Sequence, residues 1–270
     1  MVMGDLRDGE AVRRAVKDVG LIFHLGALVS IPYSYVHPGE TVETNTLGTL
    51  NVLMAAMAGK VTKVVHASTS EVYGTAQYVP MDESHPLHGQ SPYSASKIGA
   101  DMLAESFYRS FDVPVAIIRP FNTFGPRQSA RAVIPTIVSQ SLTKKAICLG
   151  SLHVTRDYTY IDDVVEAFIK LAESPASVGE VTNIGSNFEI SIAAIARKVI
   201  TIVGKNNEIV TEPKRIRPKK SEVERLWCDN TKAKRLIGWE PKISFDEGLK
   251  RTITWISNNL NLYNPELYEV

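Results

Sequence analysis

The stretch that decides the fold is KVVHASTSEVYG, residues 63–74. Its first half, residues 63–68, is short, β-branched and apolar on both faces, which is typical of a strand in a covered parallel sheet. Thr69, Ser70 and Glu71 follow the strand directly. Because α/β sheets bind ligands at the carboxyl ends of their strands, Glu71 is either a solvated strand end or a base directed at a substrate.

Strand-like and helix-like segments alternate around this stretch, which predicts a doubly wound α/β fold with a parallel sheet. Further strands are expected at residues 21–26, 113–119 and 181–185. Helices are expected at residues 42–58, 93–107, 161–172, 192–203, 231–237 and 245–258. From Gly125 onward the pattern loosens, which indicates a smaller C-terminal lobe interleaved with the last part of the sheet.

The composition is that of a globular protein, with 270 residues, 44% apolar residues and a formal charge of +1. This charge favours neither a nucleic acid nor an anionic membrane as partner. The apolar runs are too short to cross a bilayer, and the first residues do not form a signal peptide. Cys148 and Cys228 lie far apart without other ligands at metal spacing, so we expect free thiols in a reducing cytoplasm and no metal site.

Tyr93 and Lys97 occur in SPYSASK, four residues apart at the start of an expected helix. At this spacing both side chains share a helix face, so the ammonium is expected to lower the pKa of the phenol and to reach a bound ribose. Tyrosine then becomes a usable base near neutral pH. An ordinary helix pair is the alternative, because the spacing alone is not specific.

Three polar segments, HASTSEVYG, SPYSASK and RPFNTFGP, therefore follow one another at the carboxyl ends of successive strands. In this order they resemble the extended short-chain dehydrogenase/reductase family, specifically its nucleotide-sugar epimerase/dehydratase branch. The resemblance continues through GDLRD at 4–8, HLGA at 24–27, NTLGTLNVL at 45–53, RDYTYIDDV at 156–164 and LIGWEP at 236–241. It implies a Rossmann-type NAD-binding domain of residues 1–123 and 157–185 and an α/β substrate lobe of residues 124–156 and 186–270. It also implies a homodimer formed through the helices at 42–58 and 93–107.

The resemblance implies site residues as well, with NAD as cofactor and a nucleotide sugar as substrate. The catalytic residues are Thr69, Ser70, Glu71, Tyr93 and Lys97. The cofactor-binding residues are Asp5, Leu6, Leu25, Gly26, Ala27, Asn45, Ala67, Ser68, Tyr93, Lys97, Pro120 and Asn122. The substrate-binding residues are Asn122, Arg156 and Arg217. Asn122 is alternatively a turn residue, and the basic stretch around Arg217 a solvated face.

The residues Thr69-Ser70-Glu71 indicate which branch of chemistry to expect. Related epimerases usually carry small residues here, whereas 4,6-dehydratases of the GDP-mannose type carry Thr-Ser-Glu. An epimerase only removes a hydride at C4 and returns it, but a dehydratase must also abstract the C5 proton and expel the C6 hydroxyl. That step requires a second acid/base, which Glu71 can supply.

We therefore predict a nucleotide-sugar 4,6-dehydratase. Tyr93 accepts the C4 hydroxyl proton as hydride passes to NAD, Glu71 removes the C5 proton and helps water leave from C6, and hydride then returns to C6. Thr69 is expected to hydrogen-bond the C4 oxygen, while Ser70 replaces the aspartate of other dehydratases and leaves the acid for the leaving hydroxyl open. The sequence looks most like dehydratases of nucleotide-linked N-acetylglucosamine, with UDP and GDP both possible. A 4-epimerase and a catalytically silent nucleotide-sugar-binding fragment are the alternatives.

The start of the chain departs from the family pattern. Such families begin with a strand, a glycine-rich turn and a helix that receives the pyrophosphate, whereas this chain starts at MVMGDLRD, which resembles their third strand. Residues 1–4 would form that strand, with Asp5 and Leu6 beside adenine. We expect the sheet to have an unpaired apolar edge at residues 21–26. The chain is then an N-terminally truncated gene product, which we favour, or a fragment that binds NAD poorly.

Overall fold

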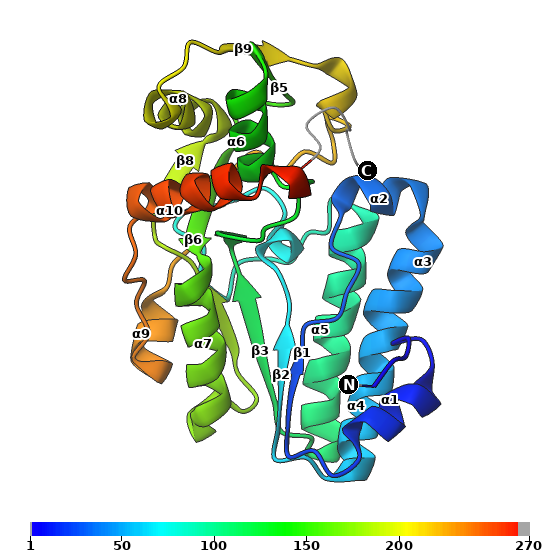
Figure 1. Cartoon of the computed structure of the whole chain (residues 1–270). Coiled ribbons are helices and arrows are strands. Elements are labelled where there is room, and N and C mark those ends of the chain that lie inside the picture. The colour runs from blue at the N-terminus through cyan, green and yellow to red at the C-terminus, as the bar shows by residue number, and fades with distance from the viewer. Residues whose placement is uncertain (1, 264–270) are drawn as a thin grey trace.

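A computed structural model of the protein describes residues 2–263. Its centre is a parallel sheet of four strands in the order β1-β2-β3-β7 (Figure 1). These are β1 (Leu21–His24), β2 (Lys63–Ala67), β3 (Val115–Pro120) and β7 (Val181–Ile184). All four were predicted, and the doubly wound Rossmann-type sheet is confirmed.

Helices cover both faces of this sheet (Figure 1). One face carries α1 (Gly9–Val16), α4 (Gly48–Gly59) and α5 (Pro92–Phe111), and the other carries α7 (Ile161–Glu173) and α9 (Thr231–Ile237). Short segments complete this half of the molecule: α2 (Ile31–Val36), α3 (Pro38–Val42), η1 (Glu43–Leu47), η2 (Ser70–Tyr73) and η3 (Pro175–Ser177). Burial of apolar side chains on both faces provides the driving force that holds the layers together.

A smaller lobe follows along the chain. It contains the sheet β4-β6-β8, formed by β4 (Asn122–Phe124), β6 (Thr155–Tyr160) and β8 (Glu189–Ser191), and the pair β5 (Ala146–Leu149) and β9 (Glu208–Thr211). Its helices are α6 (Val133–Thr143), α8 (Ile192–Val203), α10 (Phe245–Asn258), η4 (Pro213–Arg215) and η5 (Leu260–Leu262). Phe124, Ile137, Ile195 and Leu249 lie at the centre of its core.

The start of α5 shows how local sequence places the functional residues. Ser91 caps the helix by accepting a hydrogen bond from the Ser94 amide at 3.1 Å, and the Ser94 hydroxyl accepts one from the Ser91 amide at 2.9 Å. Pro92 occupies the first helical position, where its missing N–H costs nothing. This capping box begins α5 immediately before Tyr93, so Tyr93 and Lys97 lie on its first turns.

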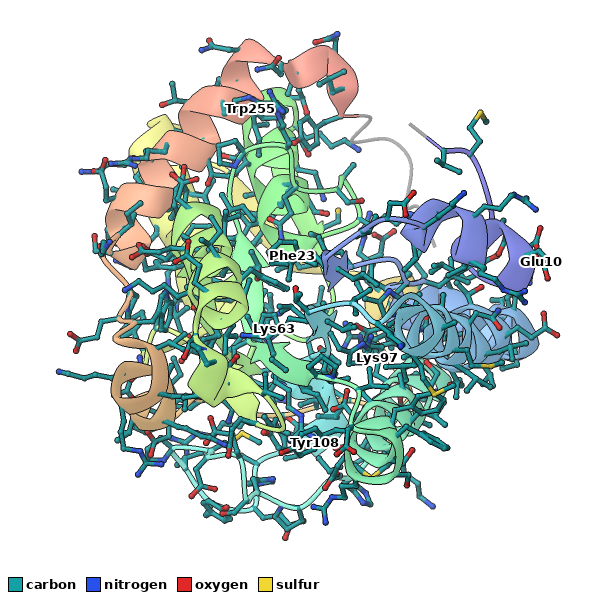
Figure 2. All side chains as sticks on the ribbon, turned by 90° about the horizontal axis from the view of Figure 1, so that it is seen from below. Glu10, Phe23, Lys63, Lys97, Tyr108 and Trp255 are labelled. Atoms are coloured by element: carbon teal, nitrogen blue, oxygen red, sulfur yellow. The ribbon has the colours of Figure 1, made fainter. Side chains whose placement is uncertain are left out.

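The edge at β1 differs from the other strands. Within residues 2–263 β1 pairs only with β2, and Leu21 and Phe23 are 38% and 41% exposed. Phe23 lies on this edge with its ring centre 6.4 Å from that of Phe168 on α7 (Figure 2). The predicted unpaired apolar edge is confirmed. The expectation that this strand is covered on both faces is wrong, because Leu21 and Phe23, which point to the same face of the sheet, are exposed.

The first described residues of the chain do not form a strand. The strand expected at residues 1–4 is not found, since residues 2–4 are irregular and Met3 is exposed. Met1, and residues 264–270 of the expected second lobe, lie outside the described residues.

Of the helices between residues 2 and 263, none has both the length and the apolar character that a membrane crossing requires.

Candidate active site at the carboxyl ends of the strands

Three chain segments meet where β2 and β3 end. Thr69 to Glu71 follow β2, α5 supplies Tyr93 and Lys97, and Asn122 follows β3. The Lys97 ammonium donates a hydrogen bond to the Ala67 carbonyl at 2.7 Å, which fixes α5 to the end of β2 (Figure 2). The site therefore lies at the carboxyl edge of the parallel sheet, where ligands bind in this class of fold.

Tyr93 and Glu71 lie together at this edge. The Tyr93 phenol is hydrogen-bonded to Thr69, and the charge of Glu71 acts on the phenol. Tyr93 is 6% exposed and Glu71 is half-buried. The Thr69 hydroxyl also accepts a hydrogen bond from the Glu71 amide at 3.2 Å, which sets the turn that carries the carboxylate. Glu71 therefore lies on the turn after β2 with a partly buried side chain whose charge acts on the phenol.

Burial controls the protonation of the Tyr93 and Lys97 pair. It raises the pKa of the Tyr93 phenol well above its ordinary value, against the opposing effect of the Thr69 hydrogen bond. Burial also lowers the pKa of the Lys97 ammonium to about 8, and the Asp101 carboxylate opposes that shift. The pKa of the phenol in the unliganded protein therefore lies above its ordinary value and not below it as expected, because desolvation outweighs the groups that favour the phenolate.

The substrate side of the site contains a residue that the sequence did not indicate, Tyr158. It lies opposite Asn122 in the register of β4 and β6 and is 3% exposed. Burial raises the pKa of its phenol to about 12, and the charges of Arg156, Arg217 and Glu71 all act on it. Tyr158 therefore connects the predicted substrate residues to the catalytic group. The alternation Arg156-x-Tyr158 in RDYTYIDD was the available signal.

Two guanidinium groups share one carboxylate next to Tyr158. Arg156 Nη2 and Arg217 Nη1 lie 3.7 and 3.5 Å from Glu222 Oε1, and the Ser151 hydroxyl donates to Glu222 Oε2 at 2.9 Å. Among the described residues, the buried Nη1 of Arg217 has no hydrogen-bond acceptor. The buried Oδ1 of Asn122 likewise has no hydrogen-bond donor among them. Unused donors on paired arginines suit a diphosphate.

The predicted cofactor residues gather beside the end of β1. A Cβ atom on Gly26 or Gly48 would lie 2.7 or 2.9 Å from the Leu6 side chain, so Leu6 packs closely on both glycines. The Asn45 amide bonds both backbone groups of Leu28, at 2.8 and 2.9 Å, and the Ser96 hydroxyl at 3.0 Å, and its cofactor role stays a prediction. This amide therefore holds the segment after β1 against α5.

Two more predicted cofactor residues are engaged by neighbouring side chains. The Asp5 carboxylate bonds the Arg7 guanidinium, which lowers the pKa of Asp5 to about 2, and the Ser68 hydroxyl donates to Asp101 at 2.8 Å. Lys97 still fits a dinucleotide, because an ammonium has three N–H groups and its described acceptor is the Ala67 carbonyl alone. The donors present thus fit the ribose and nicotinamide half of NAD.

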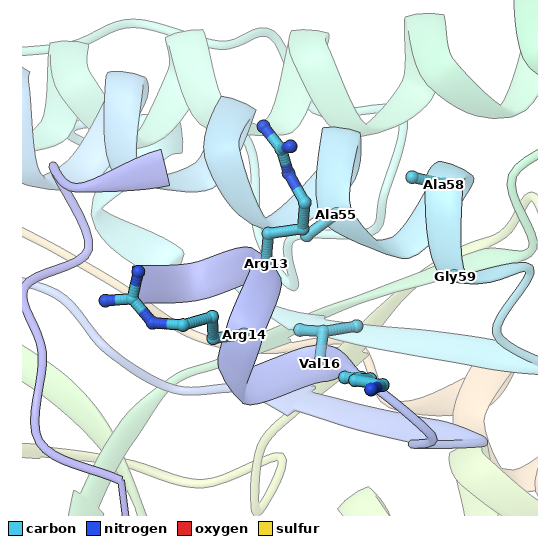
Figure 3. A pocket seen from close by; sticks show the side chains of 7 residues that line it. Arg13, Arg14, Val16, Ala55, Ala58 and Gly59 are labelled. Atoms are coloured by element: carbon cyan, nitrogen blue, oxygen red, sulfur yellow. The ribbon is translucent and has the colours of Figure 1, made fainter. Parts of the chain in front are cut away.

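A separate cleft of about 300 Å³ lies near the amino ends of the strands (Figure 3). Its lining comes from α1 and α4: Arg13, Arg14, Val16, Lys17, Ala55, Ala58 and Gly59. The carboxyl ends of these helices lead into the amino ends of β1 and β2. This cleft is therefore remote from the carboxyl ends of the strands and is distinct from the candidate active site.

This chain matches a family model and individual relatives that are named as nucleotide-sugar dehydratases or epimerases. The family model described as GDP-mannose 4,6 dehydratase matches residues 1–252. The human dTDP-D-glucose 4,6-dehydratase is 31% identical, over 96% of this chain and 75% of its own length. The UDP-glucose 4-epimerase of Mycolicibacterium smegmatis is 32% identical, over 88% of this chain and 76% of its own length.

A solved structure gives the same result for the fold. DesIV, a dTDP-glucose 4,6-dehydratase from Streptomyces venezuelae crystallised with NAD, superimposes with a TM-score of 0.89 at 30% identity. The superposition covers 97% of this chain and 80% of DesIV. The similarity therefore extends over both the sheet and the second lobe.

Proposed function

The chain belongs to the family of nucleotide-sugar dehydratases and epimerases described by the GDP-mannose 4,6 dehydratase model, and from this premise we propose that it is a nucleotide-sugar 4,6-dehydratase. The observation that carries the proposal is the position of Glu71. Its carboxylate lies close enough to act electrostatically on both Tyr93 and Tyr158. A second acid/base beside the tyrosine is what water elimination requires and what epimerisation at C4 does not.

Each residue has a defined task in this reaction. Tyr93 accepts the proton of the C4 hydroxyl, and Thr69, already bonded to the phenol, also binds the C4 oxygen. When bound, NAD would supply the acceptor for the C4 hydride and would give that hydride back at C6, while the Lys97 ammonium favours the phenolate. Glu71 removes the C5 proton, which the C4 ketone acidifies, and passes a proton to the C6 hydroxyl so that it departs as water. A proton exchanged with solvent is then added at C5 as the hydride adds at C6.

Ser70 stands next to the proposed acid. Ser70 is 2% exposed, whereas Glu71 is half-buried. A serine hydroxyl is a far weaker acid than a carboxyl group, and a carboxylate that has taken the C5 proton can pass a proton on to the leaving hydroxyl. We therefore assign the proton of the leaving hydroxyl to Glu71 and a hydrogen-bonding part to Ser70.

The substrate we propose is a nucleotide-linked N-acetylglucosamine. Its diphosphate would bind Arg156 and Arg217, whose shared partner Glu222 holds the two guanidinium groups side by side. Its sugar would lie at Asn122 and Tyr158, which face each other across β4 and β6. The choice of sugar and of UDP or GDP rests on the resemblance of HLGALVSIPYSY and RPFNTFGPRQSARAVIPTI alone. The names of the relatives make dTDP-glucose the competing substrate.

A 4-epimerase is the second candidate, because the Mycolicibacterium epimerase is as similar to this chain as the human dehydratase is. One assay separates the candidates. The protein is incubated with NAD and UDP-, GDP- or dTDP-sugars in heavy water, and the product mass is followed. Loss of one water with deuterium at C5 supports the dehydratase. An isomer of unchanged mass indicates the epimerase, and ligand binding without turnover indicates a silent binding protein.

We also propose that the protein is a cytoplasmic homodimer. Cys148 and Cys228 are free thiols, which suits a reducing compartment. The adjacent helices α4 and α5 expose Met54 and Met102, which are 49% and 43% accessible. Exposed apolar side chains on neighbouring helices are typical of an isologous helical interface.

A further inference from the structure

Three residues follow one another along one face of α5. Tyr93, Lys97 and Asp101 are spaced four apart, so they occupy the same side on successive turns. They are 6%, 3% and 0% exposed. The third of them, Asp101, takes no part in the proposed reaction, yet a fully buried carboxylate needs a specific reason to be there.

Asp101 and Lys97 bind neighbouring residues at the end of β2. The Lys97 ammonium donates to the Ala67 carbonyl at 2.7 Å, and Asp101 Oδ2 accepts from the Ser68 hydroxyl at 2.8 Å. The next residue is Thr69, which is bonded to the Tyr93 phenol. The two side chains therefore hold α5 in a fixed position against the strand that carries the catalytic loop.

The Asp101 carboxylate also contacts buried basic side chains on the neighbouring strands. Its Oδ2 accepts from Nε of Arg119 at 3.0 Å and lies 3.0 Å from Nη2, while Arg119 Nη1 donates to the Tyr73 hydroxyl at 2.9 Å. His66 Nε2 lies 3.3 Å from Asp101 Oδ1, and the His24 ring centre lies 5.3 Å from that of His66.

The titratable and charged groups around Asp101 come from every element packed on it. They are His24 on β1, His66 on β2, Tyr73 on η2, Tyr93 and Lys97 on α5, and Arg119 on β3. Burial lowers the pKa of His66, and lowers that of His24 to about 3, so both rings are neutral near neutral pH. Two cations then remain near Asp101: Arg119, which pairs with it at 3.0 Å, and Lys97, one turn away on α5, on which the charge of Asp101 acts.

We propose that Asp101 is the counter-ion that keeps Lys97 charged and correctly placed beneath Tyr93. It is a positioning residue, because it acts on the reaction only through Lys97 and the end of β2. The proposal rests on the function given above, in which the Lys97 ammonium supports the phenolate of Tyr93. A buried lysine that loses its counter-ion releases its proton at lower pH, since desolvation then acts unopposed.

The direct test is the titration of Lys97 itself, which does not require turnover. The side-chain ammonium is followed by NMR in protein with isotope-labelled lysine, and its signal is assigned with the Lys97→Arg variant. In Asp101→Asn, which keeps the size of the side chain but removes its charge, the midpoint is expected to fall by about one pH unit or more. A midpoint unchanged from the wild type would overturn the proposal.

The matched control is Asp163→Asn. Asp163 is another buried carboxylate, 2% exposed, and it accepts a hydrogen bond from the Ile243 amide at 3.0 Å. It lies on α7, on the opposite face of the sheet from α5, so its neutralisation should leave the Lys97 midpoint where it is. An equal fall in both variants would show a general effect of a lost buried charge and would contradict the proposal.

The pH dependence of kcat/KM tests the same proposal independently. If the ammonium of Lys97 is needed, activity is lost as pH rises through its pKa, so the alkaline limb of the kcat/KM profile should move to lower pH in Asp101→Asn by the same amount as the NMR midpoint. A protein that shows the NMR shift but no sugar turnover would refute the proposed function and leave the role of Asp101 intact. A lower kcat/KM with an unmoved alkaline limb would indicate a merely structural residue.

A second variant guards against a folding defect. Asp101→Asn leaves Arg119 buried without its carboxylate, which is strongly destabilising. The double variant Asp101→Asn with Arg119→Gln removes one anion and one cation together and so avoids the unpaired guanidinium. Loss of Arg119 alone favours the charged form of Lys97, so the double variant is compared with Arg119→Gln, and its Lys97 midpoint is expected to lie lower. Equal midpoints in these two folded variants would refute the proposal.

Discussion

Glu71 and Tyr93 differ in the surroundings that the fold gives them. The phenol is buried, and its raised pKa keeps it protonated in the resting protein, whereas the carboxylate lies half-buried on the turn after β2. A phenol that ionises only when a cation lies beside it is suited to one specific proton transfer. A more accessible carboxylate suits the exchange of protons with a leaving hydroxyl. The same edge of the sheet thus carries two acid–base groups with separate tasks.

Arg217 allows a prediction about substrate binding. Its buried Nη1 has no hydrogen-bond acceptor among residues 2–263, and the proposed diphosphate would provide one. In Arg217→Gln we expect KM to rise by about 10- to 100-fold with little change in kcat, because a charged hydrogen bond is worth about 1.5–3 kcal/mol and the diphosphate is bound equally before and during reaction. Steady-state kinetics on the active sugar nucleotide measures both constants.

Arg225→Gln is the control for this prediction. Arg225 lies in the same segment of the chain but pairs with Glu189 and stacks on Trp227. Its loss should leave KM unchanged. An unaltered KM in Arg217→Gln, or an equal rise in both variants, would contradict the assignment of the diphosphate site.

Residue spacing predicted which candidate residues meet at the edge of the sheet but not their electrostatics. Thr69, Glu71, Tyr93 and Lys97 come together because residues after parallel strands meet at one edge. The pKa direction of Tyr93 was missed, since spacing on a helix says nothing about desolvation. Tyr158 was missed for a related reason: its strand joins a second sheet whose position relative to β2 depends on the packing of the whole lobe.

At the level of elements, α5 carries the proposed catalytic residues Tyr93 and Lys97, and its first turn is stabilised by the capping box at Ser91. Ser91→Ala removes the hydrogen bond to the Ser94 amide. We expect the free energy of unfolding to fall by about 1 kcal/mol, measured by urea denaturation. Ser106→Ala on the exposed face of the same helix should cause no loss. Equal losses in the two variants would contradict this account of the helix start.

β6 contains a carboxylate whose burial makes stability depend on pH. Asp157 is 0% exposed, and burial raises its pKa from 3.8 to about 6, against hydrogen bonds from Ser186 and the Cys228 amide. The folded state therefore binds this proton more tightly than the unfolded state. The resulting stability is fully present below about pH 4 and is lost as pH rises through about 6.

The measurement compares the wild type with Asp157→Asn, in which this titration is absent. From about pH 4 to about pH 7 the free energy of unfolding of the wild type should decrease relative to the variant by up to about 3 kcal/mol. Loss of hydrogen bonds in the variant adds an offset that does not change with pH. A difference that stays constant across this range, or grows in favour of the wild type, would contradict the raised pKa.

Elements with a clear period were the predictable ones. The helices α8, α9 and α10 have the predicted bounds, because their apolar residues recur at helical spacing between recognisable caps. α6 was not predicted, since Pro135 and several β-branched residues obscure its helical pattern. The exposure of β1 was misjudged because the position of a strand in a sheet depends on its neighbours and is not encoded in its own composition.

At the scale of the whole molecule, the exposed face of α4 and α5 predicts the oligomeric state. Met102→Glu places a charge in the proposed dimer interface, and we expect the protein to sediment as a monomer. Val165→Glu on α7 is the control, since Val165 is 47% exposed on the other side of the sheet. A wild-type protein that is already monomeric, or a Met102 variant that remains dimeric, would contradict the proposed interface.

In the proposed function the sugar would bind between the two lobes, with the acid–base groups on β2 and α5 and with Asn122 and Tyr158 on β4 and β6. The measurement that tests the dehydratase assignment most directly is the product formed in heavy water by Glu71→Gln beside the wild type, with Glu189→Gln as a partly buried carboxylate control. We predict that the wild type and the control release one water and carry deuterium at C5, whereas Glu71→Gln forms this product about 100-fold more slowly or less. Undiminished water loss from Glu71→Gln would contradict the account.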